Sequence, residues 1–317
     1  MLHSPYGVSA PRRSYGYDSS SFLLCSGKGP KGQDSYHASR AGPHPSASAT
    51  CKSRESVKLT FLGTGTSFGV PIIGCHCPTC TSTDARDRRT RSGALLTLPH
   101  GTLLVDTPPE LRLQLLREQV GRIDAVWYTH LHADHVHGID DLRIFSDRVG
   151  APIQCYVPRG DGPAFQEKFN YIFDDGVRVP YGTSKPQLQL VEVGPTSPRS
   201  ILGAEVQPVP VPHGSMEVFG FRVGRLGYIT DAKSLPDEAV DRLRGVEVLV
   251  LNALWYGNPH PTHFTVEEAV DAAGRVGADR TLLVHLTHRV RHQELLDRLP
   301  AGIEPAYDGL SLEIADG

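Results

Sequence analysis

One stretch of the chain restricts its fold more than any other, because residues 130–135 place three imidazoles and a carboxylate within six positions. The stretch follows directly on the apolar run 125–128, which is typical of a buried strand. A turn at the end of such a strand points alternate side chains into one cleft, where they can converge on a metal ion. The pattern therefore predicts a metal site. A surface histidine cluster, or a helix cap formed by Asp134, is the alternative.

Isolated histidines and aspartates follow other strand-like runs of the chain. His213 follows residues 206–211, Asp231 follows residues 227–230, and His285 follows residues 281–284. Each of them alone is more often a cap or a hydrogen-bonded core residue than a ligand. Together they suit a layered α/β fold whose ligands gather at the carboxyl ends of the strands.

The alternation of apolar and polar residues predicts many short strands and few helices. Strand-like runs lie at 58–62, 94–98, 102–105, 124–129, 153–157, 187–193, 205–211, 219–223, 227–230, 246–251 and 281–284. Helical windows lie at 109–119, 138–148, 162–170, 236–244 and 265–275. This order predicts two sheets sandwiched between helices. Residues 171–203, rich in Gly, Pro and Ser, are expected to form an insertion or a lid loop.

Composition separates the first 56 residues from the rest. They contain 13 Ser, 6 Gly and 5 Pro, with 7 basic and 3 acidic residues, and they are expected to be a disordered or artefactual extension of a folded domain at 57–317. A transit peptide is the alternative. Subtracting their four positive charges from the chain's −3 leaves −7 for the folded part. No run approaches the roughly 18 apolar residues of a membrane span, so we expect a cytoplasmic protein without a membrane partner.

A second motif packs three thiols, Cys75, Cys77 and Cys80, into six residues. This spacing is a compact chelating geometry, and a tetrahedral structural zinc would need one more ligand. Reduced cysteines in an ordinary loop are the alternative. The remaining cysteines show no pairing pattern, so a disulfide framework is not expected. The nearby basic run 86–91 binds phosphate or lies on an exposed surface, and the residues leave this choice open.

The HxHxDH motif at residues 130–135 resembles that of the metallo-β-lactamase superfamily. The resemblance implies a four-layer αββα sandwich with two divalent ions, zinc or manganese, at one edge. Asp106, at the end of an earlier strand, matches an acid that orients a ligand imidazole. Carried over to this chain, the ligands are His130, His132 and His213 for the first metal, Asp134, His135 and His285 for the second, and Asp231 for both.

Residues 63–65, 69–71 and 307–310, together with the cysteine loop, make the chain similar to the phosphoribosyl cyclic phosphodiesterases of phosphonate breakdown. That resemblance implies that His288, three residues after His285, is the fourth ligand of the structural zinc. It also implies that His263 donates a proton to the leaving group, with His260 as a rival for this role.

The expected activity is therefore the hydrolysis of a small, cyclic phosphodiester. A pair of metals can lower the pKa of a shared water that attacks phosphorus, with His263, Asp134 and Asp231 as the catalytic residues. One alternative is an RNA endonuclease similar to the enzymes that process tRNA 3′ ends. The acidic folded part argues against it, and no nucleic-acid partner is expected. Another is a non-hydrolytic relative of pyrroloquinoline quinone biosynthesis protein B. A homodimer is the default assembly.

Overall fold

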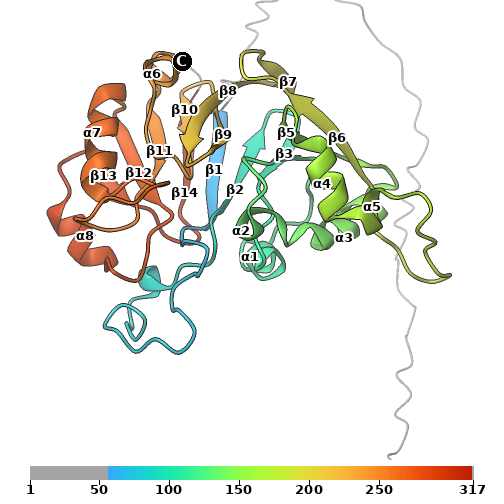
Figure 1. Cartoon of the computed structure of the whole chain (residues 1–317), viewed down its shortest axis with the longest axis horizontal. Helices are drawn as coiled ribbons and strands as arrows, with labels where there is room; N and C mark the ends of the chain where they lie inside the picture. Colours follow the sequence, from blue (N-terminus) through green and yellow to red (C-terminus); the bar gives the residue numbers. More distant parts are fainter. Residues whose placement is uncertain (1–55, 316–317) are drawn as a thin grey trace, which may run out of the picture. The chain divides into compact units, whose positions relative to one another are not determined.

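Two seven-stranded sheets lie face to face in the computed structural model, which describes residues 56–315 (Figure 1). The extension expected at 1–56 lies, apart from Ser56, outside the described residues. The first sheet has the order β14-β1-β2-β3-β4-β5-β6. Its strands are β1 (Ser56–Gly63), β2 (Gly93–Leu98), β3 (Gly101–Val105), β4 (Ala125–Trp127), β5 (Ile153–Pro158), β6 (Leu188–Val193) and β14 (Ser311–Ala315).

The second sheet has the order β13-β12-β11-β10-β9-β8-β7. Its strands are β7 (Arg199–Ile201), β8 (Ala204–His213), β9 (Met216–Val223), β10 (Leu226–Tyr228), β11 (Val248–Asn252), β12 (Arg280–Val284) and β13 (Ile303–Pro305). Strands β3 to β6 pair in parallel in the first sheet, as do β10 to β13 in the second. Carboxyl ends of several strands therefore meet at one edge of each sheet.

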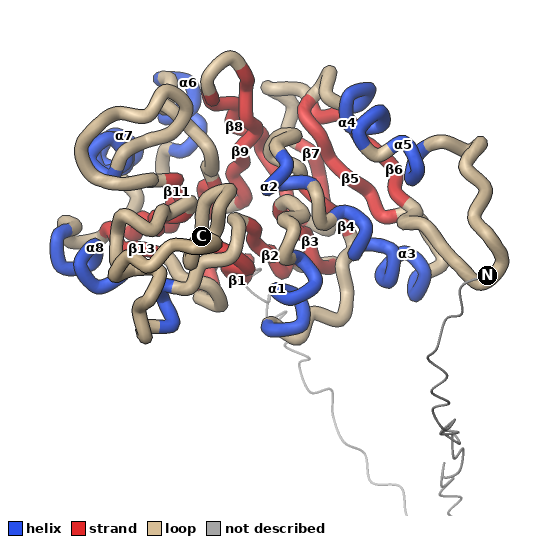
Figure 2. The backbone as a smooth tube through the Cα atoms, turned by 60° about the horizontal axis from the view of Figure 1, so that its bottom comes forward, coloured by secondary structure: helices blue, strands red, loops and turns tan. Residues whose placement is uncertain are grey.

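Helices cover the outer face of each sheet, as Figures 1 and 2 show. The first sheet carries α1 (Leu111–Arg117), α2 (Ala133–Val136), α3 (Arg143–Val149), α4 (Gly162–Lys168) and α5 (Asn170–Phe173), with the 3-10 turn η2 (Ile139–Leu142). The second carries α6 (Asp237–Leu243), α7 (Val266–Val276) and α8 (His292–Arg298). A further 3-10 turn, η1 (Ala85–Asp87), lies in the loop after β1. The four-layer αββα expectation is confirmed.

Aromatic side chains fill the space between the sheets. Trp127 of β4 meets Phe221 of β9 edge to face at 5.6 Å, and Phe221 stacks on Tyr228 of β10 at 5.3 Å. All three rings are buried in the central apolar cluster. Burial of such rings, at roughly 25 cal/mol per Å² of apolar surface, fixes the two sheets against each other.

Every predicted strand run and helical window contains an element of the predicted type, but the pattern missed β7, β13, β14, α2, α8 and most of α5. Residues 171–203, the segment where an insertion or lid loop is expected, hold the end of α5, then β6 and β7, which are edge strands of the two sheets. Their residues are largely exposed or half-buried, because an edge strand buries less of itself than a central one. Only 174–187 and short links lack helix and strand. No helix among residues 56–315 is long and apolar enough to cross a membrane.

Candidate metal centre

Strand ends from both sheets bring the predicted side chains together. The HxHxDH segment leaves β4 and enters α2, while His213 ends β8. Asp106 and His285 directly follow β3 and β12, and Asp231 lies just beyond β10. The last three have positive φ angles of 61°, 57° and 59°. Such left-handed backbone is costly for residues other than Gly, and at Asp231 and His285 it turns the side chain from the strand direction into the cleft.

Four of the predicted ligands form a first group: His130, His132, His213 and Asp231 offer atoms that all lie within 4.8 Å of one another. His132 Nδ1 lies 2.9 Å from His130 Nε2 and 3.3 Å from His213 Nε2. The other nitrogens of two rings already have partners, because His213 Nδ1 donates to the Thr262 carbonyl and His130 Nδ1 contacts the Thr129 hydroxyl. Lone pairs that converge in this way suit a divalent cation.

Asp134, His135 and His285 form a second group within the same 4.8 Å limit. Asp231 lies between the groups, since its Oδ2 is 3.3 Å from His135 Nε2 and 3.6 Å from His130 Nε2. His135 Nε2 is buried and has no hydrogen-bond partner among the described residues. An orphaned buried nitrogen is unfavourable in a metal-free site, whereas a coordinated cation would satisfy it.

Asp106 orients two of these imidazoles from behind. Its Oδ2 accepts a hydrogen bond from His135 Nδ1 at 2.7 Å, and its carboxylate accepts the main-chain N–H and the hydroxyl of Thr129 at 2.8 and 2.9 Å. The same hydroxyl is 3.0 Å from His130 Nδ1. One buried carboxylate therefore fixes His135 directly and His130 through Thr129, which directs both Nε2 atoms to the cleft.

The charges of the site favour ionised carboxylates beside mainly neutral imidazoles. Burial lowers the pKa of His285 to about 4, and it also lowers the pKa of His130 well below the usual value. Burial opposes ionisation of Asp231, but His285 and His135 outweigh it and hold the pKa of that carboxyl well below its usual range. Neutral imidazole and carboxylate are the forms that bind metal. For His135, burial is outweighed by Asp231, Asp106 and Asp134, which raise its pKa.

A cavity of about 330 Å³ opens onto this centre. His132, Asp134, His213, Asp231 and His285 line it, together with Ser67, Gly214, Ser215, Met216, Thr262 and His263. His263 Nε2 lies 3.3 Å from Asp231 Oδ2. His260, its predicted rival, does not line the cavity and contacts Thr262 and His263 from behind.

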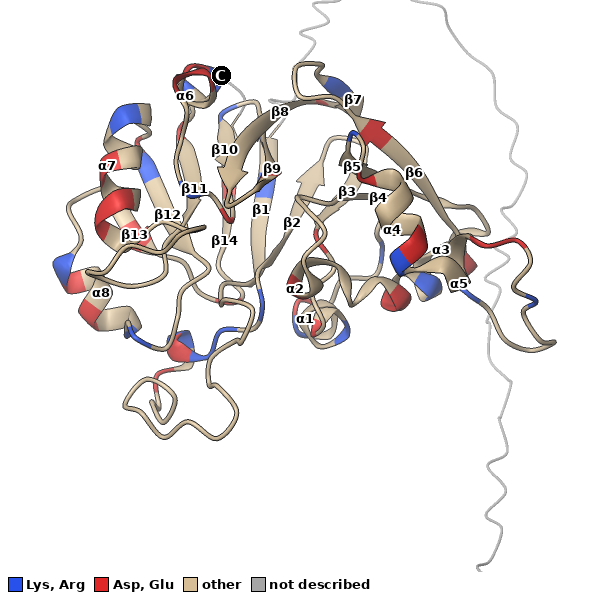
Figure 3. Cartoon of the chain, viewed as in Figure 1, with Lys and Arg blue, Asp and Glu red and all other residues tan. Residues whose placement is uncertain are grey.

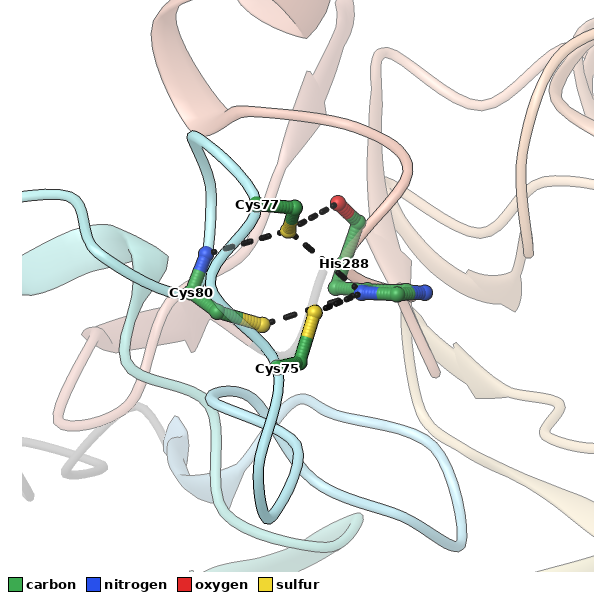
Figure 4. Close-up of side chains that lie close together, drawn as sticks. All are labelled: Cys75, Cys77, Cys80 and His288. Carbon is green, nitrogen blue, oxygen red and sulfur yellow. Dashed lines mark hydrogen bonds between the residues drawn. The ribbon is translucent and has the colours of Figure 1, made fainter.

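The cysteine motif forms a separate cluster with the predicted histidine, as Figure 4 shows. His288 Nδ1 lies 3.3, 3.5 and 3.7 Å from the sulfurs of Cys75, Cys77 and Cys80. Burial works against a thiolate at Cys77, yet hydrogen bonds from Cys80 outweigh it and lower the Cys77 pKa to about 6. Three sulfurs and one imidazole nitrogen at such distances match a tetrahedral zinc site.

A buried ion pair supports the loop that carries His288. Arg89, which is 1% exposed, lies 3.0 Å from Asp87 and donates to the carbonyls of Thr287 and Val290. Asp87 also accepts the main-chain N–H of His292. Arg89 is thus a structural residue, not an exposed or phosphate-binding member of the basic run.

The sequence did not lead us to Thr129 and Thr262, and it placed Arg89 in a basic run without indicating its buried, structural role. The two threonines each precede a site histidine directly, so the repeated Thr-His pair was a usable signal. No comparable local signal marks Arg89, whose carbonyl partners lie about 200 positions along the chain.

Residues 102–286 match the model of the β-lactamase superfamily domain. The chain therefore belongs to the metallo-β-lactamase superfamily and is a metal-dependent hydrolase close to the PhnP family.

The crystal structure of a diphosphatase from the PhnP family is 40% identical, with a TM-score of 0.75 over 82% of this chain and 97% of that one. Zinc-bound PqqB from Methylobacterium extorquens shares the fold at 21% identity, with a TM-score of 0.65 over 80% and 99% of the two chains. An octanoyltransferase from Porphyromonas gingivalis is 37% identical over 257 residues. That match takes in 80% of this chain but only 51% of the relative, so this chain spans about half of the relative's length.

Proposed function

We propose that this protein is a dinuclear metal-dependent phosphodiesterase that hydrolyses a small, cyclic phosphodiester. The proposal assigns His130, His132 and His213 of the first group to one metal, and it assigns the second group, Asp134, His135 and His285, to the other. Asp231 would bridge both metals. Zinc and manganese both suit nitrogen and oxygen ligands of this kind. When bound, such a pair supplies a water of lowered pKa and neutralises charge on the phosphoryl oxygens.

The observation that carries the proposal is that members of both ligand groups and His263 line one cavity of about 330 Å³. A volume near the lower limit of small-molecule sites favours a compact substrate over a polymer. A cyclic phosphodiester is compact, because its leaving oxygen stays tethered to the product.

His263 serves in this proposal as the proton donor to the leaving oxygen. Its Nε2 faces the cavity beside Asp231, whereas His260 lies behind it. An imidazole transfers a proton near neutral pH, and general-acid catalysis of this kind contributes about 10²–10⁴-fold. Asp134 and Asp231 keep their carboxylates ionised at the cavity wall, because neighbouring imidazoles outweigh burial and lower both pKa values.

We assign a structural zinc to Cys75, Cys77, Cys80 and His288. His288 of this cluster lies three residues after His285. The turn that the cluster fixes therefore also carries a proposed ligand of the second group. A structural metal on that turn would hold His285 in its left-handed backbone conformation.

The RNA endonuclease alternative finds less support in the charge distribution. In the view of Figure 3, α7 and α8 each carry acidic as well as basic segments instead of forming a continuous basic stripe. RNA affinity depends strongly on neutralising many phosphates.

A substrate panel tests the proposed function. One metal-loaded preparation would be assayed on bis-p-nitrophenyl phosphate, ribose 1,2-cyclic phosphate, 2′,3′-cyclic AMP, a diphosphate ester and a precursor tRNA. We expect the best kcat/KM on a small cyclic diester. Turnover of the precursor tRNA alone, or of the diphosphate ester alone, would overturn the proposal.

A further inference from the structure

Thr262 contacts two side chains of the metal centre through different atoms. Its main-chain carbonyl accepts a hydrogen bond from His213 Nδ1 at 2.9 Å, and its hydroxyl lies 2.8 Å from His263 Nδ1. We infer that Thr262 is a positioning residue whose hydroxyl binds Nδ1 and fixes the ring orientation of His263, with Nε2 directed into the cavity. This inference rests on the proposed function in one respect, namely that His263 is the proton donor.

The direction of the hydrogen bonds follows from His260. Its Nδ1 accepts the main-chain N–H of Thr262 at 3.3 Å, so this nitrogen carries no proton. The Thr262 hydroxyl, 3.2 Å from the same nitrogen, can then donate to it. The lone pairs of the hydroxyl oxygen are left for His263 Nδ1–H. With its Nδ1 held by this hydroxyl, His263 presents Nε2 to the cavity, 3.3 Å from the Asp231 carboxylate.

Ring packing alone does not select this orientation. His263 stacks on His285 at 4.9 Å with an interplanar angle of 11°, and it meets His213 edge-on at 4.6 Å. A half-turn about the Cβ–Cγ bond would leave the ring in the same plane, but it would place a carbon against the Thr262 hydroxyl. The flip would also move Nδ1 from His260 Nδ1 and Nε2 from Asp231, each 3.3 Å away, but the hydroxyl makes the shortest of these contacts that distinguish the two orientations.

The proton balance of the step follows from this geometry. A protonated His263 gives its Nε2 proton to the leaving alkoxide and becomes neutral, while the Nδ1 proton stays hydrogen-bonded to Thr262. Substrates whose leaving group needs no proton should therefore be insensitive to the hydroxyl.

Two substitutions separate positioning from general structure. Thr262→Val removes the hydroxyl but keeps the β-branch and the carbonyl that binds His213, whereas Thr262→Ser keeps the hydroxyl. With zinc-loaded proteins, we expect Thr262→Val to retain its metal content and Tm. Its kcat on 2′,3′-cyclic AMP, which has an alkoxide leaving group, should fall about 10- to 100-fold. On bis-p-nitrophenyl phosphate the change should be less than about threefold, and Thr262→Ser should restore both rates.

Long-range ¹H–¹⁵N spectra of the imidazoles provide a readout that does not depend on turnover. The parent should show a hydrogen-bonded proton on His263 Nδ1, and Thr262→Val should shift or broaden the Nδ1 signal. Equal losses on both substrates, no loss on either, or an unchanged Nδ1 signal in the valine variant would overturn the inference.

If Thr262→Val does not fold, His260→Ala tests the same chain of hydrogen bonds from its other end, with a smaller selective loss expected. A parent protein that hydrolyses neither diester would contradict the proposed function instead, and the spectra would still decide the role of Thr262.

Discussion

The Asp106 carboxylate lies 2.7 Å from Nδ1 of His135, and both side chains are buried. This contact fixes which nitrogen of His135 faces the cleft, so we expect Asp106→Asn to weaken metal binding about 10- to 100-fold. Asn tolerates the left-handed backbone of this position, which keeps the fold intact. Competitive chelator titration of the purified proteins would measure the change. A metal affinity equal to that of the parent would show that Asp106 does not support metal binding.

His263→Ala separates a proton donor from a metal ligand. We expect the variant to keep the parent's metal content, measured by elemental analysis, and to lose about 10²- to 10⁴-fold in kcat on diesters with alkoxide leaving groups. Its Nε2 lies close enough to Asp231 and His285 to share a cation with them. Loss of one metal equivalent would therefore reassign His263 as a ligand, and an unchanged rate would exclude it as the acid.

Cys77→Ser should remove zinc from the Cys75, Cys77, Cys80 and His288 cluster and lower Tm. A structural zinc contributes directly to folding free energy, so loss of one thiolate should cost several degrees. Differential scanning calorimetry and zinc analysis of the same samples test this. Cys155→Ser is the matched control, because Cys155 is buried elsewhere and belongs to no cluster within the described residues. A normal Tm and zinc content in Cys77→Ser would count against the assignment.

His292 should make the fold sensitive to acid. Burial, followed by the neighbouring Arg86 and Arg89, lowers its pKa from 6.5 to about 4. The unfolded chain therefore binds a proton before the folded chain does, and stability is lost as the pH falls from 6.5 towards 4. His292→Phe, which keeps a ring against Tyr307 at a site that is 3% exposed, should lose less stability, by roughly 1–2 kcal/mol at pH 5.

Urea unfolding at pH 7 and pH 5 measures this difference for parent and variant. Equal losses of the free energy of unfolding in the two proteins would show that His292 does not titrate in this range.

Much of the metal centre could be predicted from the sequence because its ligands follow strands with clear apolar patterns. His130 to His135 are neighbours in the chain, and Asp231 and His285 follow strands directly enough for their position at the edge to be inferred. The resemblance to known families then supplied His288 and His263.

Other features depend on contacts that no local pattern encodes. Asp308 accepts hydrogen bonds from both the main chain and the hydroxyls of Thr64 and Thr90, more than 200 positions away. The burial of Arg89 depends in the same way on the carbonyls of Thr287 and Val290. Strands β7 and β13 have only three residues each, too few to show a period of two.

The two sheets contribute unequal shares of the proposed ligands. His130, His132, Asp134 and His135 belong to the β4 end of the first sheet, and His213, Asp231 and His285 belong to the second. Neither sheet supplies a complete set of ligands for a metal, so a cation bound by residues of both sheets would link the two halves of the sandwich. Chelation should then loosen the pairing of the halves before either one melts, and metal supply would determine how long the intact molecule survives.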